Sequence, residues 1–360
     1  MTMSAFGPFN GTLPVPTGMA IAFVRDEKKF PFLNYMQLVP APEINFMYFK
    51  LDPDEPARLK ALNEYVWGYD DYRPTGRAFT VRGDWTSSTT IRWDFPFQIG
   101  ESTLRIWRKN GIDPKMIYDK ILVHKANLHR AQRCVDVVTG ATYEQSTNLN
   151  TLLGGAGLAW DKSSGEEFDG GGTPNPNFQI IKKAFLKVNR RLHLATNGVA
   201  DMDEMVCVIS VDVAEKLAVA GEIVNLLKQS QYAKELESVQ YKKWGLPETL
   251  YGVKLVVEDT PRVFINQKTD GTVADVTVAA ERDYILTGDS VYFGTRQGGL
   301  DGGIGMRNFS TWQLYHFGGE SRVEAFSEPK HELIEGHVVM EDRPLAVATV
   351  SGFKLTDVLS

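Results

Sequence analysis

The sequence lacks the features that mark several large classes of protein. It has 360 residues but only two cysteines, Cys134 and Cys207, so no disulfide framework is expected. No apolar run reaches the length of roughly 18 residues that a transmembrane helix needs, and the N-terminal residues do not have the pattern of a secretory leader. The net charge of −6 argues against a general polyanion-binding protein. A cytosolic origin is therefore expected.

Motifs of catalysis, metal binding and phosphate binding are also missing. His124 and His129 are five residues apart, whereas two metal ligands on one helix face are usually separated by four. The glycine-rich run 298–305 is not followed by the Lys and Ser or Thr of a phosphate-binding loop, and no G-x-S-x-G turn occurs. The sequence therefore predicts no catalytic residue, no cofactor and no metal site.

One long helix is expected at 114–138. Pro114 suits the first helical position, and Gly140 supplies the stop. Apolar residues recur at alternating steps of four and three, which predicts one narrow buried stripe. The stripe consists of Ile117, Ile121, His124, Leu128, Ala131, Val135 and Val138. Taken alone, the segment fits either a beam that crosses a subunit, about 37 Å long, or an ordinary core helix of an α/β domain.

The first 40 residues combine turn-forming glycines and prolines with aromatic side chains. Proline holds such a chain extended, and the aromatic rings need a surface that buries them. We therefore expect an extended arm that lies across another surface, such as a neighbouring subunit. The aromatic residues of this arm are Phe6, Phe9, Phe23, Phe30, Phe32 and Tyr35.

Residues 77–100 alternate between apolar and polar side chains, which predicts a β-hairpin with one apolar face. The run 83–90 is interpreted as the polar link between its two strands, and Pro96 indicates a free edge on the second strand. A two-stranded hairpin alone is marginally stable, so its apolar face needs a partner within the subunit or beyond it. The residues assigned to a subunit interface on this hairpin are Phe79, Arg82, Trp85, Arg92, Trp93, Asp94, Phe95 and Phe97.

The rest of the chain mixes helices and strands. A second helix is expected from Pro176, with Asn175 as its cap and with a basic outer face that could contact nucleic acid electrostatically. A buried strand at 205–211 and a helix at 214–229 follow, and further strands are expected at 250–263, at 283–299 and from 322 onward. This order lacks the regular strand–helix alternation of a doubly wound sheet or a barrel. The fold class is therefore α+β.

This order of arm, hairpin, long helix, mixed α/β region and terminal strands resembles the major capsid proteins of tailed bacteriophages, which share the Hong Kong 97-type fold. The resemblance implies an N-terminal arm at 1–60, an extended hairpin loop at 61–100, a spine helix with the first part of a peripheral domain at 101–200, an axial domain at 201–319 and terminal peripheral strands at 320–360. The stripe residues Ile117, Ile121, Leu128 and Val135 would then belong to the spine helix.

The resemblance also implies a function. The protein would be a structural, non-enzymatic subunit that assembles into hexamers and pentamers of an icosahedral shell around double-stranded phage DNA. Its partners would be copies of itself, the packaged DNA, a separate scaffolding protein, a portal and a decoration protein, with no membrane. It would assemble in the bacterial cytoplasm and end in the virion capsid. The alternatives are an encapsulin-like nanocompartment shell, which shares the fold, and a cytosolic hydrolase or transferase.

Overall fold

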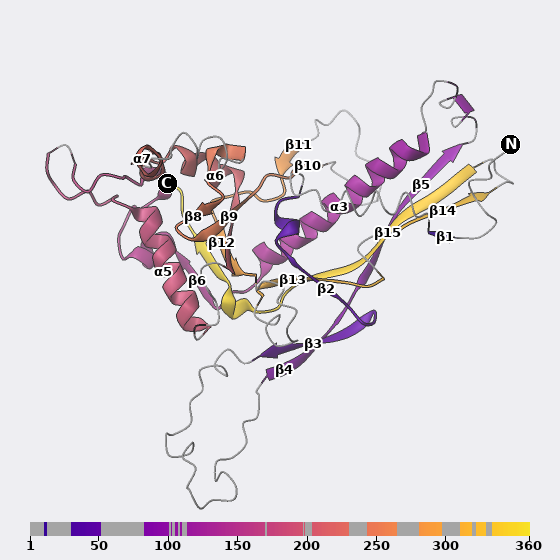
Figure 1. The fold of residues 1–360 in the computed structure, drawn as a ribbon, viewed down its shortest axis with the longest axis horizontal. Coiled ribbons are helices and arrows are strands. Elements are labelled where there is room, and N and C mark those ends of the chain that lie inside the picture. Colours follow the sequence, from indigo (N-terminus) through magenta and orange to yellow (C-terminus); the bar gives the residue numbers. More distant parts are fainter. Residues whose placement is uncertain are drawn as a thin grey trace, which may run out of the picture.

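Two sheets and one long helix organise the chain (Figure 1). The structure, a computed structural model, describes residues 11–12, 30–51, 83–100, 114–169, 171–196, 204–229, 243–264, 281–296, 310–318, 322–328 and 333–360, with single positions at 102, 105, 106, 109 and 198. Its helices include α3 (Pro114–Gly140), α4 (Leu149–Leu153), α5 (Ile180–Ala195), α6 (Val211–Val219) and α7 (Gly221–Gln229), with short 3-10 turns at Phe32–Asn34, Trp160–Lys162, Lys243–Gly245 and Thr349–Ser351.

The first sheet is built on the long strand β15 (Leu333–Ala346). One edge of β15 pairs with β5 (Ile91–Gly100), and the other pairs first with β14 (Arg322–Glu328) and then with β13 (Trp312–His316). The outer strands are β1 (Gly11–Thr12), next to β14, and β2 (Gln37–Pro40), parallel to β13.

The second sheet has the strand order β6-β16-β12-β7-β9-β8. Its central strand β7 is buried at every position, which confirms the buried strand predicted at 205–211. Helices α5 and α6 cover one face of this sheet, where Ile181 and Phe185 pack with Cys207 and Phe293. The bounds are β6 (Gln145–Asn148), β7 (Met205–Ser210), β8 (Thr249–Leu250), β9 (Val253–Glu258), β12 (Val291–Thr295) and β16 (Phe353–Thr356).

Two separate ribbons complete the fold. One pairs β3 (Asn45–Leu51) with β4 (Gly83–Thr89), and the other pairs β10 (Pro261–Phe264) with β11 (Glu281–Tyr284). In Figure 1 the β3–β4 ribbon lies at the lower side of the molecule, away from α3.

Helix α3 connects the two sheets, as Figure 1 shows. Its C-terminal half, with Cys134 and Val138, packs against Val208 and Tyr292 on the second sheet. Further toward its N-terminus, Val123 joins Val338 and Met340 of the first sheet in a smaller cluster. The long helix predicted at 114–138 is confirmed, and it lies against both sheets.

The hairpin predicted at 77–100 is wrong in its link, while its first strand lies outside the described residues. The run 83–89, expected to be a loop, is strand β4, and it pairs with β3 rather than with β5. The second predicted strand is β5, and it pairs with β15 more than 230 positions later in the chain. The error arose because Gly83–Thr89 is polar apart from Trp85, and polar β-branched residues form strands without apolar alternation. Phe79 and Arg82 lie outside the described residues.

Three further expectations need correction. The buried stripe of α3 is displaced in its first half, because Ile121 is 50% exposed and His124 is exposed, whereas Val123 and Arg130 are buried. In the C-terminal half of α3, Ala131, Val135 and Val138 are buried as predicted, and Leu128 is half-buried. The side chain of Ile117 lies outside the described residues.

Helix α5 begins at Ile180 rather than at Pro176, and Asn175 closes a preceding turn by accepting the Asn177 N–H at 2.9 Å. The helix expected at 214–229 is split into α6 and α7 at Ala220, whose backbone is extended. Contacts with residues distant in the sequence hold the starts of α5 and α7, since Glu222 accepts the Ile181 N–H and donates its own N–H to the Ser163 carbonyl.

The arm is predicted to lie across another surface, and in its described part that surface belongs to the same chain. Phe30 and Phe32 are buried in the chain's own core, where the Phe32 ring meets Trp312 edge-on at 5.4 Å between centroids. Phe6, Phe9 and Phe23 lie outside the described residues. The domain boundaries at 201 and 320 stay a prediction, and both sheets cross them, because β13 joins the first sheet and β16 returns to the second.

Candidate assembly surfaces

The β3–β4 ribbon has one seated face and one exposed face. Phe46 stacks on Tyr315 with 4.5 Å between ring centroids, and Tyr48 contacts the same ring at 5.9 Å. Residues alternate across a strand, so the neighbouring positions face the opposite way. There Met47 is 61% exposed and Trp85 is 64% exposed. The ribbon is therefore fixed to the body at its base while two large apolar side chains remain in solvent.

The other residues assigned to an interface lie on β5, over the chain's own helix. The Trp93 ring lies 4.5 Å from His129 and 4.6 Å from the guanidinium carbon of Arg133. Phe95 contacts His129 at 5.7 Å between ring centroids, and Phe97 is buried. These rings were assigned to a subunit boundary because the predicted hairpin had nothing in its own subunit to cover them. Since α3 covers them, that reason no longer applies.

Two polar members of the predicted interface remain at the surface of β5. Arg92 and Asp94 form an exposed ion pair at 3.2 Å, and Arg92 also lies 3.8 Å from Glu341 of β15. Their use in a subunit contact is not tested by a single chain and stays a prediction.

A buried charge cluster joins α3 to the first sheet. Asp342 of β15 is fully buried, and its carboxylate accepts hydrogen bonds from Arg130, at 2.6 Å, and from Arg133. Burial acts to raise the pKa of Asp342, but the two guanidinium charges outweigh it and hold the pKa below its ordinary value. The cluster places the helix at one position along the sheet.

A second buried carboxylate binds the described part of the arm. Glu258, at the end of β9, accepts the Phe32 N–H at 2.9 Å and the Thr260 N–H at 3.2 Å. Burial raises the pKa of Glu258 to about 7, although these hydrogen bonds favour the charged form. The contact between the arm and the second sheet is therefore sensitive to pH near neutrality.

A third buried carboxylate caps the N-terminus of α5. Glu222 of α7 accepts the backbone N–H groups of Ile181, at 3.0 Å, and Lys182, at 2.9 Å, together with the hydroxyl groups of Ser163 and Tyr251. A carboxylate at this end of a helix satisfies free amides and complements the helix dipole. This interaction explains why α5 begins at Ile180.

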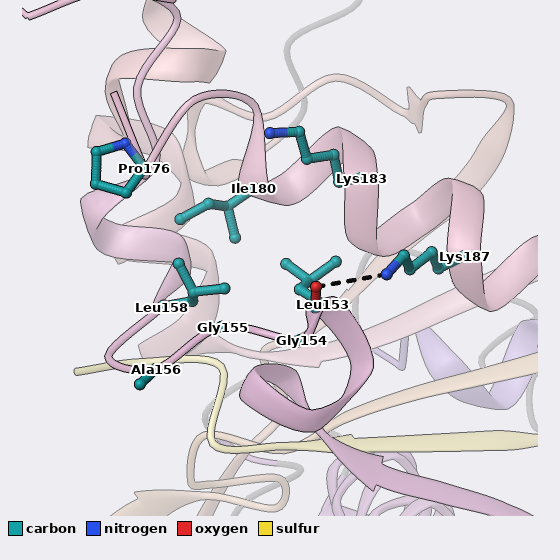
Figure 2. Close-up of a pocket in the computed structure, with 9 residues that line it drawn as sticks. All are labelled: Leu153, Gly154, Gly155, Ala156, Leu158, Pro176, Ile180, Lys183 and Lys187. Atoms are coloured by element: carbon teal, nitrogen blue, oxygen red, sulfur yellow. Dashed lines mark hydrogen bonds between the residues drawn. The ribbon is translucent and has the colours of Figure 1, made fainter. Parts of the chain in front are cut away.

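The outer side of α5 is basic and borders a pocket. The helix contains no acidic residue, and Lys183, Lys187, Arg190 and Arg191 are exposed on it. The pocket has a volume of about 320 Å³ and lies between α5 and the end of α4. Figure 2 shows Lys183 and Lys187 on successive turns of α5, above apolar side chains. Its lining residues are Leu153, Gly154, Gly155, Ala156, Leu158, Pro176, Ile180, Lys183 and Lys187.

Within the described residues, no group of three or more His, Cys, Asp and Glu side chains is placed to hold a metal ion. Nor, over the same residues, is any helix both long and apolar enough to cross a membrane. Cys134 and Cys207 are fully buried, and burial raises the pKa of the Cys134 thiol to about 12, which keeps it protonated and unreactive.

Comparison with known proteins gives likenesses in structure only. No family model matches the sequence, and no curated protein is similar to it in sequence. The chain is similar to a phage-related protein from Bordetella bronchiseptica RB50, with a TM-score of 0.61 and 10% identity over 97% of this chain and 98% of that one.

Two phage capsids are also similar to the chain. The capsid of Myoviridae phage XM1 has a TM-score of 0.49 and 12% identity over 91% of each chain. The capsid of the cyanophage P-SCSP1u has a TM-score of 0.48 and 7% identity over 100% of this chain and 91% of that one. The likeness to the phage-related protein shows that the two chains share a fold, and the strand order and the long helix agree with the α+β class that the sequence predicts.

Proposed function

We propose that this protein is a structural subunit of a phage capsid and assembles with copies of itself into an icosahedral shell. The observation that carries the proposal is the β3–β4 ribbon, which is seated on Tyr315 by one face and exposes Met47 and Trp85 on the other. Full burial of one such side chain contributes about 1.5–3 kcal/mol, so a second copy that covers the ribbon gains stability from it.

The ribbon suits an intersubunit contact because its base is packed against the first sheet. Phe46 and Tyr48 hold the ribbon on the first sheet, and register is maintained along all seven residue pairs from Asn45–Thr89 to Leu51–Gly83. A pre-formed surface loses less conformational entropy on binding than a flexible one. Trp85 is therefore the residue of the predicted interface set that the geometry supports best.

The proposed role is non-enzymatic, and the packaged molecule is double-stranded DNA. The protein would form hexamers and pentamers, assemble in the cytoplasm of the host bacterium with a separate scaffolding protein, a portal and a decoration protein, and finish in the virion. Arg190 and Arg191, exposed on α5, offer one surface for phosphate groups, in agreement with the electrostatic attraction of cations to DNA.

The test is to express the protein alone and with the proteins of its phage, and to measure particle formation by light scattering and negative-stain microscopy. Shells tens of nanometres across that protect DNA from nuclease would support the proposal. Shells filled with one co-purifying enzyme would indicate a nanocompartment instead. A protein that stays strictly monomeric under all these conditions would exclude the structural role and favour the alternative of a cytosolic hydrolase or transferase.

A further inference from the structure

A finger loop at residues 165–177 extends from the body between η4 (Trp160–Lys162) and α5. In Figure 1 this mauve segment projects away from the body at the far left, beyond α5 and α7. Its two sides are held together by hydrogen bonds from the Asn175 N–H to the Glu167 carbonyl and from the Asp169 N–H to the Thr173 carbonyl, both 2.8 Å. The finger loop is thus a structured projection.

The side chains on the finger loop are acidic and aromatic. Glu166, Glu167 and Phe168 are exposed, and the Phe168 ring is 52% exposed although it is large and apolar. Asp169 has a local role, because its Oδ1 accepts the Gly171 N–H at 3.0 Å and the Thr173 N–H at 2.8 Å. The carboxylates of Glu166 and Glu167 form no ion pair with the described residues, so they are available to an external cation.

The pocket beside α5 has the opposite character. Lys183 donates to the Phe178 carbonyl at 2.6 Å, and Lys187 donates to the Leu152 carbonyl at 3.0 Å, so both ammonium groups are held in place beside it. An ammonium group has three donors, and each therefore keeps capacity for an incoming carboxylate. Leu158 and Ile180 supply an apolar lining, as Figure 2 shows.

Among the described residues, no acidic side chain lines this pocket, and the finger loop of the same chain does not fill it. Pro176, at the base of the finger loop, forms one wall of the pocket, while Phe168 remains exposed on the projecting part. The finger loop and the pocket therefore carry opposite charges on one subunit. A contact between two different patches of identical subunits is a heterologous contact, and it closes into a ring when the rotation between subunits allows.

We propose that the finger loop of one copy docks into the pocket beside α5 of the next copy, with Phe168 against Leu158 and Ile180 and with Glu166 and Glu167 beside Lys183 and Lys187. This inference rests on the proposed shell function and names one heterologous contact by which copies assemble. The pocket volume of about 320 Å³ is sufficient for one aromatic side chain. Opposite charges around the aromatic ring select the partner and its orientation.

Charge exchange tests the pairing. The swapped finger, Glu166→Lys with Glu167→Lys, and the swapped pocket, Lys183→Glu with Lys187→Glu, each place like charges together. Each should lower the yield of particles about tenfold, because like charges opposed in an interface are strongly unfavourable. A chain with all four substitutions regains opposite charges and should assemble to within about twofold of the unmodified protein, as the same principle requires.

The matched control changes two exposed cations further along α5, Arg190→Glu with Arg191→Glu. The particle yield of this control should fall less than that of the swapped pocket. Adding the swapped finger to the control should not restore its particle yield. If the four-substitution chain assembles no better than either pair alone, the docking is wrong. If the swapped pocket instead loses retained DNA while its shells form normally, the pocket binds a polyanion and the docking is again wrong.

Disulfide trapping gives an independent readout. The native Cys134 and Cys207 are fully buried, so introduced thiols react against a low background. A chain with Phe168→Cys and Ala156→Cys should form disulfide-linked multimers in assembled particles, whereas Phe168→Cys with Val219→Cys, at an exposed position on α6, should not. Equal multimers from both pairs would overturn the inference. Unmodified protein that forms no particles would instead count against the proposed function.

Discussion

Arg130 of α3 and Asp342 of β15 form a buried ion pair with 2.6 Å between Nε and Oδ2, although they are 212 positions apart in the sequence. Arg133, one helical turn later, binds the second oxygen of the same carboxylate. Removing one partner of a buried pair leaves an uncompensated charge, which is far more costly than the loss of a surface pair. The Asp342 carboxylate therefore adds a buried ionic contact to the apolar packing between the long helix and the first sheet.

Replacement of that carboxylate tests the coupling. Asp342→Asn should lower the free energy of unfolding by about 3–5 kcal/mol, because two guanidinium groups lose their negative partner. Denaturant titration followed by circular dichroism measures this change. The control is Asp136→Asn on the exposed side of α3, where the loss should stay below about 0.5 kcal/mol. Equal effects at both positions would show that the cluster does not fix the helix.

The stability of the unassembled protein should fall as the pH rises from about 4.5 to about 7. Glu258 has an ordinary pKa of 4.5 and a folded-state pKa of about 7, so the folded protein binds the proton more tightly. Its contribution is fully present below the lower value and is lost as the pH passes through the higher one. Urea titrations across this range measure the slope.

Glu258→Gln should reduce that slope, since an amide does not titrate but still accepts a hydrogen bond from the Phe32 N–H. Glu144→Gln, at an exposed position, serves as the control and should leave the slope unchanged. An unaltered pH dependence in Glu258→Gln would assign the slope to other groups.

Phe97→Ala should destabilise the isolated subunit. Phe97 is 5% exposed, and truncation of a buried Phe costs about 3–5 kcal/mol through lost burial and the remaining cavity. Thermal melting of unassembled protein gives the comparison with the unmodified chain. A melting temperature close to that of the parent would return Phe97 to the set of residues that a neighbour covers.

Trp85→Ala, in contrast to Phe97→Ala, should leave the stability of the isolated subunit nearly unchanged and should reduce assembly. Trp85 is exposed on the ribbon, so the free energy of unfolding should change by less than about 0.5 kcal/mol, as for other exposed positions. Shell yield, measured by sedimentation and microscopy, should fall sharply because the neighbouring copy loses an aromatic anchor. Normal yield with normal stability would show that the exposed face of the ribbon is not an assembly contact.

Glu222→Ala should loosen the start of α5. Two backbone amides and two hydroxyl groups would lose their acceptor, and loss of a helix cap alone costs about 0.5–2 kcal/mol. Amide hydrogen exchange should increase at Ile181 and Lys182 but not at Leu192 near the helix end. Uniform exchange along α5 would indicate that the carboxylate does not cap this helix locally.

Elements with local signals could be predicted from the amino-acid sequence alone. Pro114 and Gly140 bound the long helix, and the uninterrupted apolar run from Met205 identifies a strand that is buried on both faces. Order along the chain was also readable, and with it the fold class and the resemblance to phage capsid proteins. These features depend on helix-end chemistry and on periodicity within one segment, which are independent of the rest of the chain.

Which surfaces meet depends on long-range contacts in the folded chain. Strand β5 pairs with β15 rather than with its neighbour in sequence, and Asp342 determines that Arg130 lies on a buried face of α3. Trp85 and Phe97 look alike as apolar residues of an alternating segment, yet one is exposed and the other is buried. Such outcomes depend on contacts between residues more than 200 positions apart, whose free energy no local pattern contains.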